Sequence, residues 1–275
     1  GSVFSPYYHW ALKKNPSADP ENHCCINVAL YGNGARRWTM TERSRASVSR
    51  SAHHFAVGPS SLEWKNDALE LGINEWSVPI PKQVRGKIRI YPDQLFHFVT
   101  ALDDQGLHHW GPIAPSARVD VELESPGISW KGHAYLDSNE GEELLVHRFT
   151  EWDWSRATLA DGSTAVIYDV QPKEGPDRLL GLRFFADGRI EEFMPPPRHS
   201  LPKTGWRIAR RMRSDEGSTV RVIDMLEDTP FYERSVLVSS LFGERVISMH
   251  ETLNVPRLSS PIVQRMLPFR MPRFG

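Results

Sequence analysis

The chain has 275 residues, of which 33 are Lys or Arg and 34 are Asp or Glu, so its formal charge at pH 7 is only −1. This balance provides no general field that would attract nucleic acid, and nucleic acid is therefore not expected as a partner. The length lies between that of one large β domain and that of two ordinary domains, and we predict two compact halves.

The two cysteines, Cys24 and Cys25, are adjacent in the sequence. Neighbouring cysteines seldom reach the geometry of a disulfide, so both are predicted to be free thiols in a reducing, cytosolic compartment. The sequence shows no charged start followed by an apolar segment, and no run of about 18 apolar residues. Neither a signal peptide nor a membrane-spanning helix is expected, and any contact with a membrane should be peripheral.

The hydrophobic periodicity is mainly that of β-strands. Seven segments alternate or are rich in β-branched residues, namely 26–31, 37–42, 86–91, 117–123, 164–170, 219–225 and 244–250. Turn signals separate such segments, and the clearest hairpin is centred on Asp187-Gly188. One short helix is predicted near 259–267. The spacing of strands and turns indicates an all-β fold built from barrels or sandwiches.

A polar, Gly-containing segment at 138–143 is the candidate link between the two halves. We therefore predict an N-terminal β domain at 1–140 and a C-terminal β domain at 141–275. No sequence repeat relates the two halves.

The segment 107–112, Leu-His-His-Trp-Gly-Pro, is the first candidate for chemistry. Successive side chains of a strand point to opposite faces, so His108 and Trp110 would share one face and His109 would take the other. A titratable ring would then lie beside an aromatic wall. The alternative is structural, because Trp often lines a barrel core and His often satisfies a buried carbonyl.

The segment 132–139 is the second candidate. His133, Tyr135 and Asp137 are two residues apart and would share a strand face, where an imidazole, a phenol and a carboxyl could converge. The structural alternative is that Asp-Ser-Asn at 137–139 is ordinary turn chemistry at a strand end.

The segment 149–156 contains two tryptophans on one predicted strand face. Trp152 and Trp154 alternate with Glu151 and Asp153, so the two indoles would point the same way. They could bind a flat apolar ligand, or they could pack between the two halves, because Trp buries a large area.

Familiar cofactor signatures are missing from the sequence, which has no glycine-rich nucleotide motif, no H-E-x-x-H, no paired C-x-x-C and no G-x-S-x-G. The pairs His53-His54 and His108-His109 each offer at most one ligand to a metal site, because adjacent strand residues point to opposite faces. Neither a cofactor nor a metal is predicted. The cysteines are assigned no chemistry, because neither a Gly-rich elbow nor a helix start adjoins them.

Long and unusual strings spread over nearly the whole chain resemble the carotenoid 1,2-hydratase family, also called hydroxyneurosporene synthases. These strings lie at 1–8, 23–32, 37–43, 108–112, 135–139, 152–156 and 230–235. The resemblance implies two lipocalin-like antiparallel β-barrel domains in tandem, with few short helices, in agreement with the strand-rich pattern.

By the same resemblance, the family's proposed catalytic residues carry over one at a time, an aspartate onto Asp137, a tyrosine onto Tyr135, a histidine onto His108 and a tryptophan onto Trp110. His133 is added only because of its shared strand face, as a candidate for substrate binding. Trp152 and Trp154 join it, because their indoles could hold an extended polyene.

The implied activity is that of a cofactor-independent hydro-lyase. Water would add to the terminal C1=C2 double bond of an acyclic carotenoid, such as neurosporene or lycopene, to give a 1-hydroxy carotenoid. The hypothesis is that Asp137, kept protonated by an apolar pocket, protonates the alkene and leaves a tertiary carbocation. Tyr135 and His108 would orient the carboxyl or the water, with His108 as a base, and Trp110 would face the cation.

Two other functions fit the same sequence. One is a non-catalytic, lipocalin-like carrier of an apolar ligand, and the other is an isomerase or cyclase on the same fold that quenches the cation internally. The carrier would bind its ligand without any change of mass, and the isomerase or cyclase would incorporate no oxygen from water.

A substrate dissolved in membrane requires an enzyme that reaches the bilayer. The tail at 257–275 mixes apolar residues with four arginines and contains no acidic residue, which suits anionic lipid. Alternatively, the tail packs across an opening of its own domain. The resemblance implies a phototrophic bacterium and a peripheral location on the cytoplasmic side of its inner, photosynthetic membrane.

Overall fold

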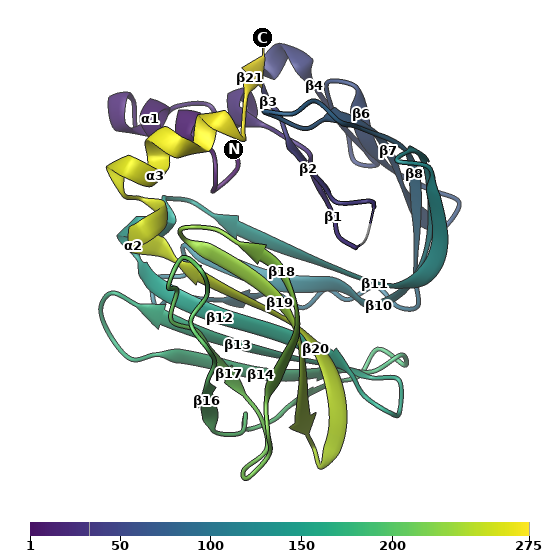
Figure 1. The fold of residues 1–275 in the computed structure, drawn as a ribbon, viewed down its shortest axis with the longest axis vertical. Coiled ribbons are helices and arrows are strands. Elements are labelled where there is room, and N and C mark those ends of the chain that lie inside the picture. Colours follow the sequence, from purple (N-terminus) through teal and green to yellow (C-terminus); the bar gives the residue numbers. More distant parts are fainter. Residues whose placement is uncertain (33, 275) are drawn as a thin grey trace. The chain divides into compact units, whose positions relative to one another are not determined.

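A computed structural model describes residues 1–32 and 34–274, which form a β-rich fold with few short helices (Figure 1). The helices are α1 (Pro6–Lys14), α2 (Val255–Leu258) and α3 (Pro261–Met266), with 3-10 turns η1 (Pro20–His23), η2 (Arg45–Ser47), η3 (Leu145–His147) and η4 (Leu267–Phe269). The strands up to residue 141 are β1 (Asn27–Leu30), β2 (Arg37–Met40), β3 (Glu42–Arg43), β4 (Val48–Arg50), β5 (His54–Val57), β6 (Ser60–Lys65), β7 (Ala68–Trp76), β8 (Gln83–Pro92), β9 (Thr100–Ala101), β10 (His108–Ser125) and β11 (Ile128–Gly141). The later strands are β12 (Phe149–Thr158), β13 (Thr164–Pro172), β14 (Arg178–Phe184), β15 (Ile190–Glu192), β16 (Arg198–Ser200), β17 (Arg211–Arg213), β18 (Arg221–Asp228), β19 (Tyr232–Leu241), β20 (Glu244–Asn254) and β21 (Arg273–Phe274).

The predicted elements are found in the structure. Each of the seven predicted strands overlaps an observed one, and the predicted helix near 259–267 contains α3. The hairpin at Asp187-Gly188 joins β14 to β15, where Gly188 has a φ of 87° that favours glycine. The helix α1 was not predicted. It begins at Pro6, and the side chain of the preceding residue, Ser5, caps it by accepting a hydrogen bond from the Tyr8 N–H.

The chain forms two compact units that are both discontinuous in sequence. Unit 1 comprises residues 1–93, 117–134 and 264–275, and unit 2 comprises 94–116 and 135–263. Residue 140, the predicted domain boundary, lies within β11 and in unit 2. Independent folding of 1–140 and 141–275 stays a prediction.

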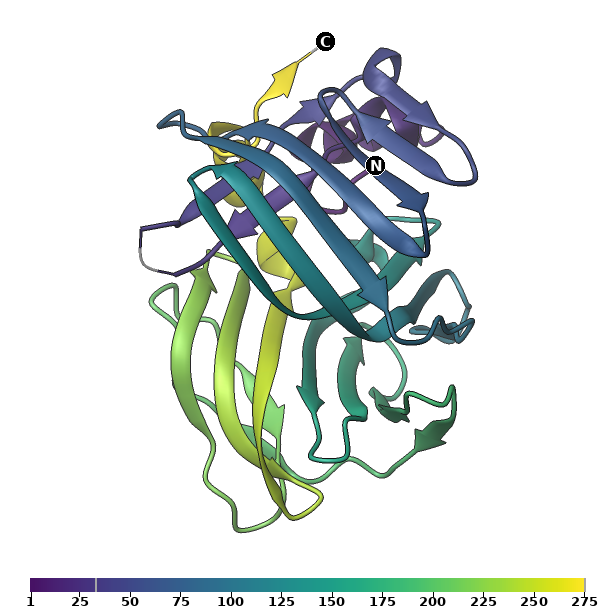
Figure 2. The ribbon, with the colours of Figure 1, turned by 90° about the vertical axis from the view of Figure 1, so that its right-hand side faces the viewer.

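Unit 1 is organised around the antiparallel strands β4 to β8, followed in the sheet order by β10 and β11 (Figure 2). Val119, Val121 and Leu123 of β10 are buried, and they alternate with Asp120 and Glu122 as a strand with one face on a core requires. This core also contains residues of β1, β5, β7 and β8. Its formation removes many apolar side chains from water, each contributing about 1.5–3 kcal/mol when fully buried.

The two ends of the described chain meet within unit 1. β21 pairs in parallel with β3, in the register Arg273 opposite Glu42. Glu42 is fully buried and accepts hydrogen bonds from Ser5 and Arg273, and its Oε1 lies 2.7 Å from His23 Nδ1. Several partners therefore compensate the burial of this carboxyl group.

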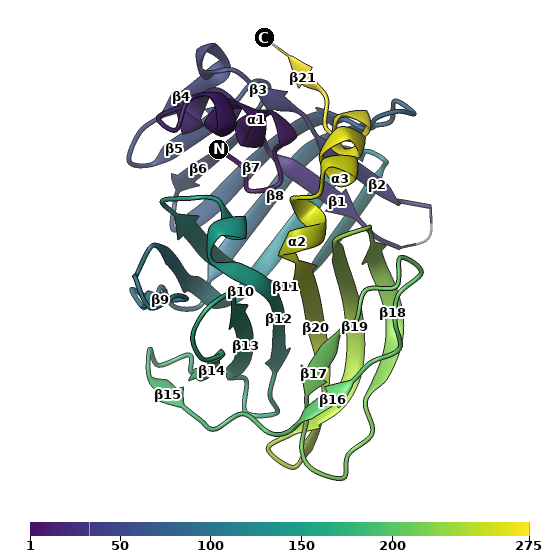
Figure 3. The same ribbon diagram turned by 90° about the vertical axis from the view of Figure 1, so that its left-hand side faces the viewer.

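Unit 2 contains a seven-stranded antiparallel sheet with the order β15-β14-β13-β12-β20-β19-β18 (Figure 3). Strand alternation gives this sheet two different faces. The aromatic face carries Trp152, Trp154 and Arg156 of β12, Tyr168 of β13, and Glu251 of β20. The polar face carries the intervening residues of the same strands, namely Asp153 of β12, Asp169 of β13, Glu233 of β19 and His250 of β20.

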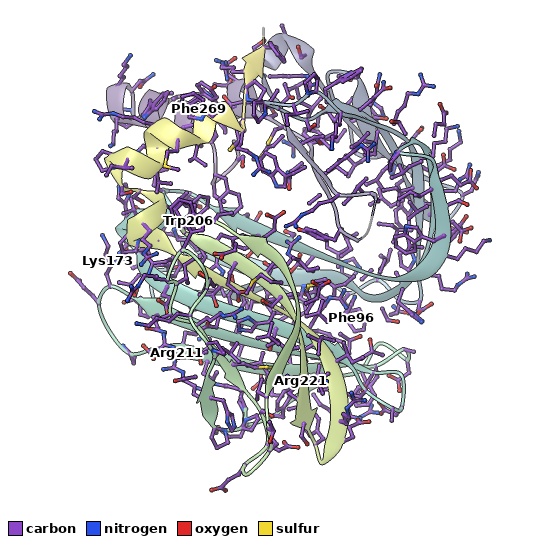
Figure 4. All side chains as sticks on the ribbon, viewed as in Figure 1. Phe96, Lys173, Trp206, Arg211, Arg221 and Phe269 are labelled. Carbon is purple, nitrogen blue, oxygen red and sulfur yellow. The ribbon has the colours of Figure 1, made fainter. Side chains whose placement is uncertain are left out.

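The β16–β17 hairpin covers the polar face of the unit 2 sheet. The Arg211 N–H of β17 donates to Asp153 Oδ1 at 3.3 Å, and the Arg211 carbonyl oxygen lies 2.8 Å from His250 Nε2. Arg211 is labelled in Figure 4. Arg213 donates through Nε to Asp169 at 2.8 Å. Charged hydrogen bonds thus hold the hairpin on the sheet.

The predicted pair of closed barrels is not found. Among the residues that the structure describes, neither large sheet closes on itself, because one runs from β11 to β4 and the other from β15 to β18. A barrel requires the first and last strands to pair, and these edge strands do not. Within the described part of the chain, no helix is long and apolar enough to cross a membrane.

Candidate active site

The Asp137 carboxyl group is the centre of the candidate site, and all the residues described around it belong to unit 2. Trp110 Nε1 donates a hydrogen bond to Asp137 Oδ2 at 2.8 Å, and the Tyr135 hydroxyl donates to the same oxygen at 3.2 Å. Tyr135 and Asp137 are two residues apart on β11, so strand alternation directs both side chains to one face. The structure thus brings together three of the four residues predicted to be catalytic.

Aromatic rings of the sheet support both hydrogen-bond donors. The Trp110 ring packs edge-on against Tyr168, with 5.5 Å between ring centroids. The Tyr135 ring lies against Trp154 at 5.4 Å. Tyr168 and Trp154 are themselves directly opposite in the register of β13 and β12. The carboxyl of Asp137 is therefore held between donors that cannot move without disturbing the aromatic face.

Burial raises the pKa of Asp137 above the usual range of a carboxyl group. The hydrogen bonds from Trp110 and Tyr135 act in the opposite direction, because they stabilise the carboxylate, but they do not overcome the burial. Burial also raises the pKa of Tyr135 well above 10, so the phenol keeps its proton and remains a donor. This environment favours the neutral acid form of Asp137.

His108 is buried on the same strand face as Trp110, as the sequence predicts, with 3% and 1% of their surfaces exposed. Its ring packs edge-on against Phe149 at 4.9 Å, and a Cβ on Gly141 would come within 2.4 Å of its Nδ1. Burial lowers the pKa of His108, which favours the neutral imidazole. Its Nε2 has no hydrogen-bond partner among the described residues, so His108 is not bonded to Asp137 through that atom.

The three predicted substrate-binding residues differ in their surroundings. Trp152 packs edge-on against Phe149 and Tyr168, each at 6.1 Å. Trp154 is buried, and its Nε1 has no partner within the described part of the chain. His133 is exposed. The predicted common face of the two tryptophans is observed, whereas a role for any of the three in binding stays a prediction.

Three residues at the site were missed by sequence reasoning. Tyr168 lies within the apolar run 164–170, where it is indistinguishable from an ordinary core residue. Arg156 places its guanidinium carbon 5.0 Å from the centre of the Tyr135 ring, and Glu251 lies opposite Trp154 in the register of β20 and β12. Arg156 ends the string 152–156 that carries the family resemblance, but that resemblance gives it no role, and Glu251 lies in none of these strings. Each charge acquires its neighbours at the site only when distant strands pair.

The cysteines belong to unit 1, whereas the candidate site is described within unit 2. Both are free thiols, as predicted, and burial raises the pKa of Cys25 to about 12. Its thiol therefore stays protonated at neutral pH and is a poor nucleophile.

Comparisons with known proteins identify the family of the chain. The family model described as carotenoid hydratase CrtC matches residues 1–275. The acyclic carotenoid 1,2-hydratase of Rubrivivax gelatinosus is 55% identical over 274 residues, which are 99% of this chain and 68% of that protein. The enzymes of the same name from Thiocapsa roseopersicina and Cereibacter sphaeroides are 51% and 39% identical, over 100% and 99% of this chain and 68% and 96% of their own lengths. The chain therefore belongs to the carotenoid hydratase CrtC family.

Proposed function

We propose that the chain is an acyclic carotenoid 1,2-hydratase that adds water to a terminal C1=C2 double bond without a cofactor. The observation that carries the proposal is the half-buried Asp137 carboxyl, which accepts hydrogen bonds from Trp110 and Tyr135. Its partial removal from solvent raises its pKa. Protonation of an alkene requires an acid in its neutral form, and the raised pKa of Asp137 shifts the carboxyl group toward that form. The names of the relatives supply the substrate class.

The proton would move from Asp137 to C2 of the terminal isopropylidene group. Both hydrogen bonds from the neighbouring side chains go to Oδ2, which leaves Oδ1 as the oxygen that carries the acidic proton. Breaking the O–H bond and forming the C2–H bond leaves a carboxylate on the enzyme and a positive charge on the tertiary C1. The Trp110 and Tyr135 donors would stabilise that carboxylate as it forms.

Water would then add to the cation at C1. The Trp110 ring donates to Asp137, and Tyr168 and Trp154 pack against Trp110 and Tyr135. The faces of these rings would stabilise the cation, an interaction worth about 2 kcal/mol when water is excluded. Loss of a proton from the added water completes the tertiary alcohol. His108, neutral and with a free Nε2, would accept that proton, while Trp152 would hold the polyene. His133 is kept as a substrate-binding candidate only through the sequence prediction.

Incubation of the purified protein with lycopene or neurosporene in micelles, in oxygen-18 water without added cofactor, tests the function. We expect a product heavier than the substrate by one labelled water. Unchanged substrate bound to folded protein would instead support a carrier, and a product of unchanged mass would support an isomerase or cyclase. The lipocalin-like arrangement implied by the family resemblance is part of the same proposal, and it would provide the apolar interior for the polyene.

We also propose that the enzyme docks peripherally on the cytoplasmic side of the photosynthetic membrane through its C-terminal segment. Ile262, Met266 and Phe269 are 72%, 40% and 75% exposed on α3 and the turn after it, where Arg265 and Arg270 are exposed too. Phe269 is labelled in Figure 4. Exposed apolar side chains among arginines suit an anionic lipid surface. Leu258, Val263 and Met271 are buried, so the segment also packs on its own protein, as the structural alternative required.

Flotation with anionic liposomes tests this docking. Deletion of the segment would remove buried residues, so substitution of exposed ones is the sharper experiment. Ile262→Ser combined with Phe269→Ser should reduce the bound fraction several-fold, whereas Ile247→Ser on β20, which removes a side chain that is 57% exposed, should not. If the Ile262→Ser/Phe269→Ser variant floats as well as the Ile247→Ser variant, the C-terminal segment is not the docking surface.

A further inference from the structure

A continuous row of side chains crosses the aromatic face of the unit 2 sheet. Tyr168 of β13 is opposite Trp154 of β12, and Trp154 is opposite Glu251 of β20. Glu251 is in turn opposite Arg234 of β19. Directly opposed residues of antiparallel strands have Cβ atoms about 4.5–5.5 Å apart on the same face, so their side chains interact. The row therefore continues from the aromatic support of Asp137 into charged residues.

The positive charge of Arg156 lies next to the Tyr135 ring, whose hydroxyl group contacts Asp137. Arg156 follows Trp154 by two residues on β12 and shares its face. Its guanidinium carbon is 5.0 Å from the centre of the Tyr135 ring, and the Tyr135 hydroxyl donates to Asp137. Burial lowers the pKa of Arg156, yet an arginine keeps its charge at any physiological pH.

The negatively charged residue beside the site is Glu251 of β20, the cross-strand neighbour of Trp154. Glu251 accepts a hydrogen bond from Arg234 Nε at 2.8 Å, and 22% of its side chain is exposed. Its cross-strand neighbour Trp154 packs against the Tyr135 ring. Charges act more strongly in such a partly buried site than in water, because the effective dielectric constant is lower.

We propose that Glu251 and Arg156 are positioning residues that set the proton affinity of Asp137 through opposite charges. Glu251 holds the proton on the acid, and Arg156 limits this effect so that the proton can pass to the alkene. This inference rests on the hydration proposed above. Among the described groups near Asp137, the side chains of Tyr135, Trp110 and Tyr168 carry no formal charge. Arg234 pairs with Glu251 at 2.8 Å and so offsets part of its charge, which leaves Glu251 and Arg156 as the two charged groups that act on Asp137 directly.

The directions of the electrostatic effects agree with this assignment. Burial is the main cause of the raised pKa of Asp137. The charge of Glu251 raises that pKa further, and the charge of Arg156 lowers it. Removal of the Glu251 charge should therefore lower the pKa of Asp137, and removal of the Arg156 charge should raise it.

The pH profile of kcat/KM provides the first test. Hydration requires protonated Asp137, so activity falls as the pH rises through the pKa of this group. Glu251→Gln should move this fall to lower pH and Arg156→Gln should move it to higher pH, each by roughly half a unit to one unit. Arg156→Lys, which keeps the charge, and Glu191→Gln, which removes an exposed carboxylate on edge strand β15, should leave it in place.

Infrared titration of the Asp137 carboxyl, assigned by difference from Asp137→Asn, provides the second test and requires no turnover. Opposite shifts in the two glutamine variants are the expected result. Shifts in the same direction, or none, would overturn the inference, because a structural role alone has no reason to move the titration in opposite directions. Opposite shifts in a protein that hydrates no carotenoid would overturn the proposed function and retain the electrostatic role.

A second pair of variants keeps the inference testable if the glutamine variants do not fold. Glu251→Leu and Arg156→Met remove the same charges and fill a similar volume with apolar atoms, a change that partly buried sites often tolerate. The expected shifts have the same directions, and shifts of one sign would again contradict the proposal.

Discussion

Carboxyl groups removed partly or wholly from solvent occur on the polar face of the unit 2 sheet and beside its aromatic face, and the two sets have different partners. On the polar face, Glu233 accepts from Arg210 Nη1 at 2.9 Å and lies 2.7 Å from His250 Nδ1. Asp169 accepts hydrogen bonds from Arg198 and Arg213. On the aromatic face, the donors to Asp137 are a neutral indole and a neutral phenol.

The difference in partners reverses the direction of the pKa shift. Burial alone would raise the pKa of all three carboxyl groups, but the charged donors outweigh it and lower the pKa of Glu233 and Asp169. Neutral donors do not outweigh it at Asp137, whose pKa is raised. A buried carboxyl is thus a structural anion when its partners are charged and an acid when they are neutral.

Among the substitutions that test this contrast between charged and neutral partners, Asp137→Asn should have the largest effect. The amide keeps the size of the carboxyl, and its oxygen can still accept from Trp110 and Tyr135, but it has no acidic proton to donate. Hydration should fall by about 10³-fold or more, while the free energy of unfolding changes by only about 1 kcal/mol. Product formation in oxygen-18 water and urea unfolding measure the two effects. A variant that stays active would show that Asp137 is not the acid.

Glu233→Gln should give the opposite result on the other face. The substitution leaves the Arg210 guanidinium and the His250 imidazole buried without their shared anion. We expect a loss of about 3 kcal/mol in the free energy of unfolding, measured with urea, and an unchanged hydration rate per folded molecule. The exposed pair Arg189–Glu191 is the matched control, and Glu191→Gln should cost less than about 0.5 kcal/mol. Equal losses in both variants would mean that the polar face contributes little to stability.

The sequence could predict which neighbours share a strand face, but not which strands meet. The alternation in 107–112 and 132–139 correctly paired His108 with Trp110 and Tyr135 with Asp137, because that relation is local. Tyr168 and Glu251 reach the site only through the register of β13, β12 and β20, which depends on contacts between distant segments. The family resemblance supplied roles for the first four residues and none for these two.

Two local signals of the sequence compare differently with the structure. Residues 138–141 of the polar segment predicted as a link belong to β11, while the division into 1–140 and 141–275 stays a prediction. β11 ends the strand order of its sheet, and an edge strand tolerates exposed polar side chains. The short helix α1 was missed because part of its support is distant in sequence, as the hydrogen bond from the Tyr7 hydroxyl to the Met271 carbonyl shows.

Asp153 is intermediate between the two kinds of carboxyl group, and it gives the smallest expected effect. It accepts hydrogen bonds from Thr252 and from the Arg211 N–H. Its Oδ2 has no hydrogen-bond partner among the described residues and lies 3.7 Å from Arg211 Nε. Burial raises its pKa from 3.8 to about 6. A carboxyl whose pKa is raised by folding contributes stability below its unfolded pKa, and that contribution is lost as the pH rises through the folded pKa.

The wild-type protein should therefore lose about 1–3 kcal/mol of unfolding free energy relative to Asp153→Asn between about pH 4 and pH 7. Urea unfolding of both proteins across this range measures the difference. Parallel curves would mean that Asp153 is ionised throughout. His250 Nε2, 3.8 Å from Asp153 Oδ1, would then supply enough positive charge to place Asp153 with Glu233 and Asp169 as a structural anion.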